Sequence, residues 1–252
     1  MFLLSTGRTG TRFLAGFFAE YGMDVAAHHT TRGTRVLNIL NNLALLGLLP
    51  MSAADAWLAR ASIPGIMAEP RRWVECNPYY FNSIPALRRA FPQARFIFVT
   101  RHPRAFCESH IRWERERMVS RIANQLVPFW GPVGYQEQLL GLLGNYRQRV
   151  RYYAKVWARR NAVILGHLAD DADAIRLRFE DIFDAPDGLA RLTTLLRELD
   201  IAPSRPIDAD AVRTRVNQTD RTAAMFWDAH CDALVLRHCG AVMGRLGYAL
   251  DA

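Results

Sequence analysis

Lysine is nearly absent from the sequence: Lys155 is the only one, and arginine supplies the rest of the Lys and Arg total. The chain is nevertheless basic, with a formal net charge of +8 at pH 7. The planar guanidinium of arginine can donate to two oxygens of a phosphate or sulfate at once. The composition therefore favours an anionic partner, such as a nucleotide, a polyanionic glycan or a nucleic acid.

Cysteines and long apolar runs are also scarce. The cysteines form no C-x-x-C pair and lack the spacing of a zinc site; they are Cys76, Cys107, Cys231 and Cys239. The longest apolar stretch, Val36–Leu49, is interrupted by asparagines and is shorter than the roughly 18 to 20 residues that a membrane span needs. The apolar start, Met1–Leu4, is too short for a signal peptide. We therefore expect a reduced, cytoplasmic protein with no metal site and no membrane span.

The sequence shows no internal repeat and no clear linker, so we expect a single domain over residues 1–252. Short apolar segments typical of buried strands alternate with segments of helical periodicity. This alternation predicts a helix-rich α/β fold with a central parallel β-sheet flanked by helices. Strands are expected over residues 2–4, 24–27, 73–75, 95–100 and 174–179. The first helix is expected from Phe13 until Gly22 closes it, and further helices over 33–61 with a break at Pro50, 82–91, from Arg104, from Leu139 to Trp157, 186–199 and 231–246. Residues 113–135 are expected to form a mobile or lid-like region.

A short glycine-containing turn connects the first predicted strand to the first predicted helix. The first N–H groups of a helix lack partners within the helix, and the helix dipole places partial positive charge at the same point. Together they form an anion site, to which two arginines add full charges and several hydroxyl groups add donors. The residues expected to contribute are Ser5, Thr6, Gly7, Arg8, Thr9, Gly10, Thr11 and Arg12. A purely structural turn is the alternative.

The turn differs from an ATP-binding loop. Such a loop needs G-x-x-x-x-G-K-[ST], whereas Gly7 and Gly10 are only three residues apart and the lysine is missing. A nucleoside triphosphatase also needs an aspartate at the end of a later strand to hold magnesium. The strand over residues 95–100 is followed by Arg101 instead, which suits a second anion better than a metal ion. Two anion-binding elements thus follow two strands, where ligands of open α/β sheets bind, and a nucleotide with a 5′-phosphosulfate and a 3′-phosphate fits them.

The two elements together resemble the sulfotransferases that use 3′-phosphoadenosine 5′-phosphosulfate (PAPS), particularly bacterial members and those acting on carbohydrates. Ser5–Thr11 is similar to their 5′-phosphosulfate loop, and Phe96–His110 to their 3′-phosphate element. The resemblance implies a P-loop-like fold, no metal requirement, and a 3′-phosphate held by Arg101 and Ser109. Arg8 stands where many members carry lysine, and the K-G-x-x-G element of the cytosolic small-molecule members is not visible. Three later segments also resemble the family: Arg178–Asp181, Val216–Asn217 and Cys239–Tyr248.

Sulfuryl transfer to a hydroxyl needs a general base. Glu75 is the first candidate, because Glu75–Phe81 resembles the E-K-[TS]-x-x-Y-F segment of glycan sulfotransferases, whose glutamate is the base. The lysine of that segment is replaced by Cys76. The alternative for Glu75 is an ion pair with Arg71 or Arg72.

Two adjacent histidines, His28 and His29, are the rival bases. They follow the second predicted strand and are therefore expected near the same cleft. Histidine titrates near neutrality, which suits a base. The alternative is that they are ordinary loop residues.

The acceptor is expected to be a hydroxyl group of a glycan or a small metabolite. One stretch repeats arginine and forms either a track for an anionic acceptor or a solvated face paired with Glu114 and Glu116; its members are Arg112, Arg115, Arg117 and Arg121. A P-loop-type kinase and a basic nucleic-acid-binding protein remain alternative functions. Nucleic-acid binding explains the charge but not the gathering of glycine and arginine at strand ends, so we expect no nucleic-acid partner.

Overall fold

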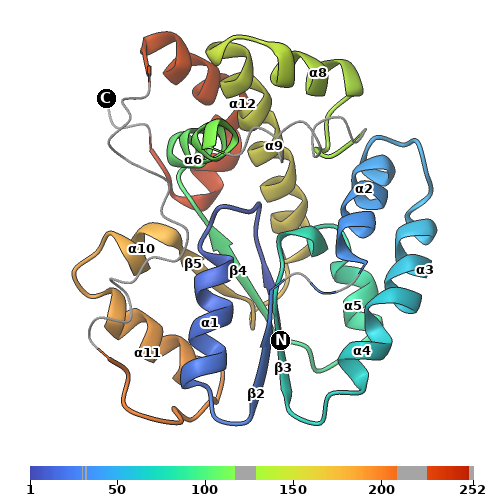
Figure 1. The fold of residues 1–252 in the computed structure, drawn as a ribbon, viewed down its shortest axis with the longest axis vertical. Helices are drawn as coiled ribbons and strands as arrows, with labels where there is room; N and C mark the ends of the chain where they lie inside the picture. Colours follow the sequence, from blue (N-terminus) through green and yellow to red (C-terminus); the bar gives the residue numbers. More distant parts are fainter. Residues whose placement is uncertain (30, 32, 117–128, 209–225, 250–252) are drawn as a thin grey trace.

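The computed structural model describes residues 1–252 except 30, 32, 117–128, 209–225 and 250–252. Within the described residues, five parallel strands form one sheet in the order β2-β3-β1-β4-β5 (Figure 1). The strands are β1 Phe2–Leu4, β2 Val25–His28, β3 Arg72–Cys76, β4 Phe96–Thr100 and β5 Ile175–Arg178. The predicted α/β fold with a central parallel sheet is confirmed.

The central strand β1 contributes to two hydrophobic cores, because successive side chains of a strand point to opposite faces. Phe2 and Leu4 join one core together with Phe96 of β4, whereas Leu3 joins the other. All three side chains of β1 are buried. Burial on both faces explains why this strand is continuously apolar in the sequence.

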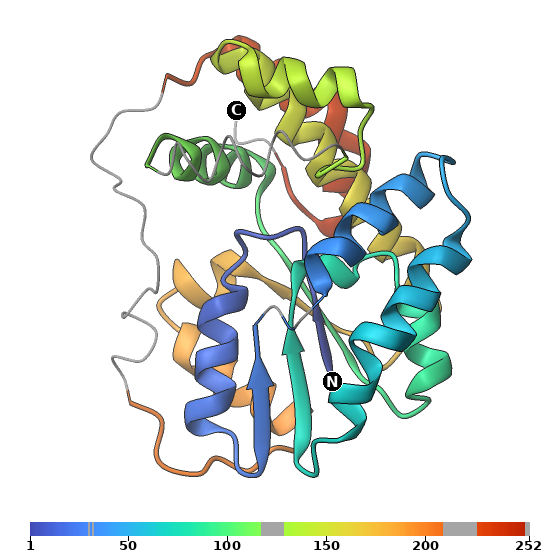
Figure 2. The same ribbon diagram turned by 45° about the vertical axis from the view of Figure 1, so that its right-hand side comes forward.

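Helices cover both faces of the sheet (Figures 1 and 2). Their bounds are α1 Thr11–Tyr21, α2 Thr34–Leu45, α3 Met51–Ala61, α4 Ile63–Met67, the 3₁₀ turn η1 Pro78–Tyr80, α5 Ile84–Ala90, α6 Pro103–Glu116, α8 Tyr135–Leu143, α9 Tyr146–His167, α10 Phe179–Phe183, α11 Gly188–Glu198 and α12 Ala229–Leu246. Helices α1, α10 and α11 pack in the core that contains Leu3. Helices α3, α5, α6, α9 and α12 contribute to the core on the other face.

The parallel strands place all their carboxyl ends at one edge of the sheet. Helices α6, α8 and α12 lie beyond that edge, and the turn between β1 and α1 lies beneath α6 (Figures 1 and 2). The segments that follow β1, β3 and β4 therefore meet in one region, where ligands of open α/β sheets bind.

Most predicted elements are present, but the helix predicted from Leu139 to Trp157 is wrong as a single element. It is two helices, α8 and α9, separated at Gly144 and Asn145. Gly144 is extended, and the Asn145 side chain accepts a hydrogen bond from the Gln148 backbone in a capping box that starts α9. The break is local chemistry that apolar periodicity alone does not reveal.

Two further regions differ from the sequence expectation. Of the predicted lid-like region 113–135, the first residues complete α6 and Tyr135 begins α8, while residues 117–128 lie outside the described residues. The strand predicted to reach Phe179 ends at Arg178, and Phe179 begins the short helix α10. In the described part of the chain, no helix is both long and apolar enough to cross a bilayer.

Candidate active site

The turn after β1 has an unusual backbone. Gly7, Arg8 and Gly10 have φ angles of 89°, 55° and 77°. A left-handed conformation costs free energy at a residue with a side chain such as Arg8, and such strain is concentrated at functional sites. At Gly10 an added Cβ would lie 2.7 Å from a ring carbon of Phe183. Turns of this kind point successive N–H groups into a concavity that binds anions.

The donors of this turn are available to a ligand. Helix α1 starts after Gly10 with no side-chain cap, so its first N–H groups keep their capacity for an anion. The hydroxyl groups of Thr6 and Thr9 are buried, and neither has a hydrogen-bond partner among the described residues. Such buried donors are normally satisfied, which a bound anion would achieve. The Ser5 hydroxyl, by contrast, already has a partner, because its Oγ accepts from the N–H of Gly7 at 3.1 Å.

The two predicted anion-binding elements lie in direct contact. The Arg8 Nε donates to the Ser109 Oγ at 3.1 Å, and the Arg101 Nη1 donates to the Arg8 carbonyl oxygen at 2.9 Å. The Arg101 guanidinium also stacks on the Phe179 ring, 4.1 Å from its centroid. A nucleotide with two anionic groups requires Arg8 and Arg101 on the same edge of the sheet, and they lie there.

Later segments of the chain hold the end of β4 in place. The Trp157 indole donates to the Arg101 carbonyl oxygen at 2.8 Å. The His102 backbone N–H donates to one carboxylate oxygen of Glu180 at 2.9 Å, and the Tyr248 hydroxyl donates to the other at 3.0 Å. The resemblance noted for Arg178–Asp181 and for the segment ending at Tyr248 thus has a physical basis, since both segments position the arginine after β4. Val216–Asn217 lies outside the described residues.

Glu75 is fully buried at the carboxyl end of β3. Its Oε1 accepts from the Thr31 N–H, the Thr31 hydroxyl and the Asn77 amide at 3.4, 3.3 and 3.1 Å. Its Oε2 accepts from the Trp73 indole at 3.2 Å. Burial raises the pKa of Glu75 to about 7, because desolvation outweighs these hydrogen bonds. A carboxyl group poised near neutrality is suited to proton transfer.

The alternative interpretation of Glu75 as the ion-pair partner of Arg71 or Arg72 is contradicted. Arg71 pairs with Glu69 instead, at 2.7 Å. The Arg72 guanidinium donates to the carbonyl oxygens of Leu199 and Asp200, at 3.4 and 2.6 Å.

His28 is the last residue of β2 and His29 follows it, so both lie at the carboxyl edge of the sheet. The His28 ring stacks on Trp73 with 4.0 Å between centroids, and Trp73 in turn donates to Glu75. The His29 Nε2 lies 3.1 Å from the Thr11 hydroxyl of the anion loop. Burial, and then the charge of Arg12, lowers the pKa of His29. A histidine held neutral in this way can accept a proton near neutral pH.

Arg160 of α9, which reaches the anion loop, was not among the predicted site residues. Its Nη1 lies 3.4 Å from the Thr6 carbonyl oxygen. A signal was present, because Arg160 falls on the apolar stripe of its helix, three residues after Trp157 and four before Ile164. A cation on such a stripe marks either a buried ion pair or a ligand contact.

The arginine stretch on α6 is only partly testable. Arg117 and Arg121 lie outside the described residues, and the side chain of Arg115 is likewise not described. Glu114, which one interpretation placed on a solvated face, is buried and forms an ion pair with Arg149 of α9. That part of the solvated-face interpretation is wrong.

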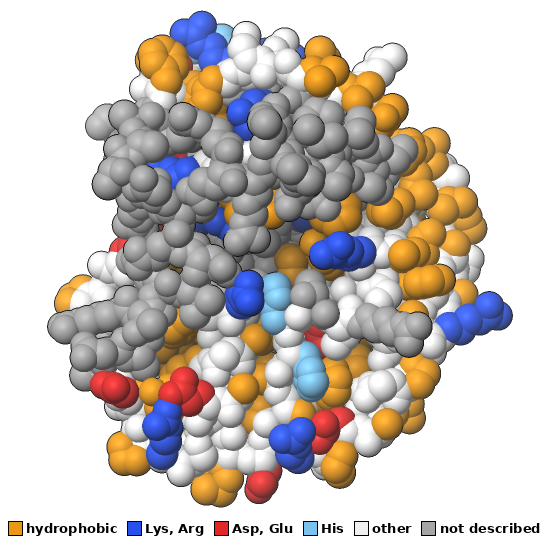
Figure 3. All heavy atoms as spheres, in the orientation of Figure 1, with side chains coloured by type: hydrophobic (Ala, Val, Ile, Leu, Met, Phe, Trp, Pro, Cys, Tyr) orange, Lys and Arg blue, Asp and Glu red, His pale blue; other side chains and the backbone are white. Residues whose placement is uncertain are grey.

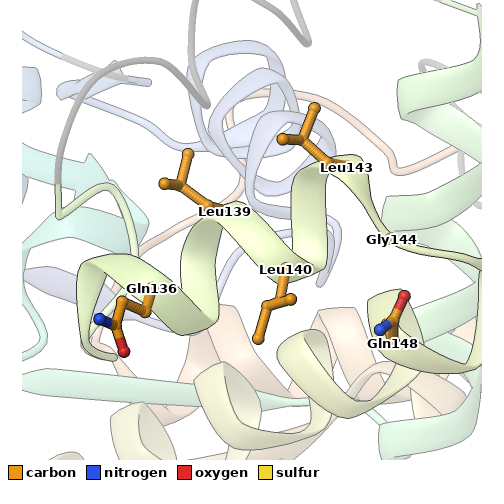
Figure 4. A pocket seen from close by; sticks show the side chains of 6 residues that line it. All are labelled: Gln136, Leu139, Leu140, Leu143, Gly144 and Gln148. Carbon is orange, nitrogen blue, oxygen red and sulfur yellow. The ribbon is translucent and has the colours of Figure 1, made fainter.

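The face that carries these elements is basic near its centre. Blue side chains (Lys or Arg) and a pale-blue His side chain lie near the N-terminal end of α1 in the space-filling view (Figure 3), and Arg12 of α1 is exposed. A separate apolar pocket of about 490 Å³ lies on α8 and the start of α9 (Figure 4); it is lined by Gln136, Leu139, Leu140, Leu143, Gly144 and Gln148. It contains none of the predicted site residues. Within the described ranges, no three His, Cys, Asp or Glu side chains cluster as metal ligands would.

Comparison with known proteins identifies the fold and the family. In structure the chain is similar to the sulfotransferase domain from the curacin biosynthetic pathway, with a TM-score of 0.54, 18% identity, and coverage of 99% of this chain and 97% of that one. A sulfotransferase from Alicyclobacillus acidocaldarius aligns with a TM-score of 0.49, 13% identity, and coverage of 99% and 96%. No curated protein sequence matches the chain. The model of the sulfotransferase family matches residues 50–202, more than half of the chain, and the chain therefore belongs to the sulfotransferase family.

Proposed function

We propose that this sulfotransferase transfers a sulfuryl group from PAPS to a hydroxyl group of a glycan or small metabolite, with residues 1–252 acting as one transferase domain. The observation that carries the proposal is the direct contact of the two anion-binding elements, in which Arg8 bonds both Ser109 and Arg101. Such contact suits one nucleotide with two anionic ends. Family membership favours this function over a kinase or a nucleic-acid-binding protein.

The proposed donor contacts follow from the geometry of the loop. Ser5, Gly7, Thr9, Gly10 and Thr11 would surround the 5′-phosphosulfate with N–H and hydroxyl groups, helped by the charges of Arg8 and Arg12. The hydroxyl groups of Thr6 and Thr9, which have no partner among the described residues, fit this role. Arg101 and Ser109 would hold the 3′-phosphate, with Arg101 preorganised on the Phe179 ring. The donor supplies the activated sulfuryl group.

The proposed reaction is an in-line displacement at sulfur. The acceptor oxygen forms a bond to sulfur while the bond from sulfur to the 5′-phosphate oxygen breaks, leaving 3′-phosphoadenosine 5′-phosphate (PAP). Arg8 and the loop N–H groups stabilise negative charge on the transferring group and on the departing phosphate. The acceptor proton passes to Glu75.

The oxygens of Glu75 are not equivalent in this role. Oε1 already has three donors, whereas Oε2 has only the Trp73 indole. Oε2 therefore keeps the capacity to accept the acceptor proton. His29, next to Thr11, is the second candidate base, and His28 supports the Trp73 ring.

A ligand-binding experiment tests the proposal. PAP at about 100 times its Kd should raise the Tm by about 5–10 °C, from the mass-action stabilisation of a domain of this size. ATP, which lacks the 3′-phosphate, should raise it far less. Arg101→Ala should remove most of the PAP shift. The matched control is Arg95→Ala, because Arg95 precedes the same strand at the opposite edge of the sheet and pairs only with exposed Asp200.

Transfer is measured separately with radiolabelled PAPS and a panel of glycans and small hydroxyl compounds. Sulfated product is expected with at least one hydroxyl acceptor. A Tm that responds equally to PAP and ATP, together with no labelled product, rejects the proposed function.

A further inference from the structure

Arg160 of α9 lies in the protein interior. Only 5% of its surface is exposed. Its guanidinium lies over the ring of Phe81, 4.9 Å from the centroid. Burying a cation is costly unless an anion and hydrogen bonds compensate for the lost hydration.

The hydrogen-bond partners of Arg160 are all neutral. Its Nη1 donates to the Thr6 carbonyl oxygen at 3.4 Å, and its Nη2 donates to the Asn38 Oδ1 at 2.7 Å and to the Trp130 carbonyl oxygen at 3.1 Å. Its Nε is buried with no partner among the described residues. These contacts orient the guanidinium but leave its positive charge unbalanced.

Another buried arginine on the same helix has its positive charge neutralised by a carboxylate of the protein. Arg149 is 8% exposed and forms an ion pair with the buried carboxylate of Glu114. Among the residues that the structure describes, no carboxylate forms such a pair with Arg160. The protein thus neutralises one buried arginine of α9 internally and leaves the other for a different anion.

The surroundings of Arg160 identify where that anion would lie. Thr6 belongs to the anion loop, so Arg160 approaches the loop from the side of α9. Arg160 also lies near His110, together with Arg8 and Arg101; burial, and then these three positive charges, lower the pKa of His110 well below its usual value. The Nε2 of His110 is buried and lacks a partner among the described residues. Three arginines and a neutral histidine therefore converge on the proposed donor site.

We propose that Arg160 is a third arginine of the donor site, whose buried positive charge is balanced by the 5′-phosphosulfate group of the bound nucleotide. This inference rests on the proposed function. It assigns Arg160 to the 5′ end of the donor, because its contact is with the loop that follows β1. Arg160 also links that loop to α2 through Asn38.

The test compares nucleotides that differ in their 5′ group. Dissociation constants are measured by calorimetry for PAPS, adenosine 5′-phosphosulfate and adenosine 3′-phosphate, with wild type, Arg160→Met and Arg160→Lys. Methionine removes the charge while roughly keeping the volume, a change that buried ions often tolerate. The matched control is Arg159→Met, because neighbouring Arg159 also donates only to carbonyl oxygens, those of Pro132 and Leu45, but is exposed.

Arg160→Met should weaken PAPS and adenosine 5′-phosphosulfate about 10- to 100-fold, as expected for the loss of one or two charge-assisted contacts. Adenosine 3′-phosphate should change by less than about threefold, and Arg160→Lys should recover part of the lost affinity. Arg159→Met should leave all three constants unchanged.

Two results would overturn the inference while leaving the proposed function intact. Equally weakened binding of all three nucleotides would show that Arg160 only stabilises the fold. Unchanged dissociation constants would show that the nucleotides do not interact with its charge. If Arg160→Met does not fold, Arg160→Lys decides: retention of adenosine 5′-phosphosulfate binding within about tenfold supports the proposal, and its loss rejects it. Failure of wild type to bind PAPS would reject the proposed function itself.

Discussion

Replacing Glu75 with glutamine removes a titrating group from the interior while keeping its shape. The wild-type carboxyl is fully buried, and its pKa is raised from 4.5 to about 7. Between these two pH values the folded protein binds more protons than the unfolded chain, so stability falls as pH rises. The loss is complete once the pH exceeds the pKa of the folded state. Glutamine does not titrate, so the variant does not suffer this loss.

The size of the effect follows from the pKa difference. A difference of one pKa unit corresponds to 1.36 kcal/mol, so a shift from 4.5 to about 7 destabilises the ionised wild type by about 3 kcal/mol. The advantage of Glu75→Gln over wild type should therefore grow by about 3 kcal/mol between pH 4.5 and pH 8. Any constant difference from the four donors around the carboxyl is present at every pH and does not enter this change.

Urea unfolding at pH 4.5, 6 and 8 measures this change, provided that wild type and variant share the same m-value. Glu69→Gln is the matched control, because Glu69 lies near the surface and Arg71 lowers its pKa. The control should gain nothing at high pH. A difference between Glu75→Gln and wild type that stays flat from pH 4.5 to 8 would refute the assignment of a raised pKa, and with it the physical reason for choosing Glu75 as the base.

Further predictions concern turnover and the anion loop. Glu75→Gln should bind PAP normally yet lose most transfer activity. The kcat/KM of the wild type should rise with pH through the Glu75 pKa of about 7. Normal turnover by the variant would assign the role of general base to His29. Arg8→Ala should lower kcat about 10²- to 10³-fold in a transfer assay, and Arg8→Lys should restore part of it. Gly10→Ala should destabilise the protein by about 1–3 kcal/mol in urea unfolding, because the alanine Cβ would need positive φ and would meet the Phe183 ring. An unchanged unfolding midpoint would contradict this reason.

The sequence was a good guide to β1 and β4, because each is a short apolar run followed by polar or glycine-containing residues. Phe2–Leu4 and Phe96–Thr100 were predictable in this way, since each is buried on both faces. The break between α8 and α9 was not, because the apolar residues keep a helical period across Gly144 and Asn145. Local capping chemistry decided that position.

The sequence indicated a set of candidate site residues but not the contacts between them. The loop and Arg101 could be proposed from their places after two strands, and Ser109 from the resemblance to the family's 3′-phosphate element. The bond between Arg8 and Ser109 joins residues 101 positions apart, and nothing in either segment specifies it. Burial could not be predicted either: Glu75 occupies a segment rich in polar and aromatic residues, and its raised pKa arises because β3 lies inside the sheet.

The order of the strands explains why these groups converge. The chain leaves β1 toward β3 and β2, whereas it leaves the adjacent strand β4 toward β5. Because parallel crossovers are right-handed, these opposite directions place α1 on one face of the sheet and α9 on the other, as the two hydrophobic cores show. Neighbouring strands whose connections diverge leave a crevice between them at their carboxyl ends. Arg8 follows β1 and Arg101 follows β4, so their contact lies at this crevice, with Glu75 of β3 on the other side of β1. In the proposed reaction the donor therefore binds between β1 and β4, and the acceptor reaches the sulfur from the side of β3.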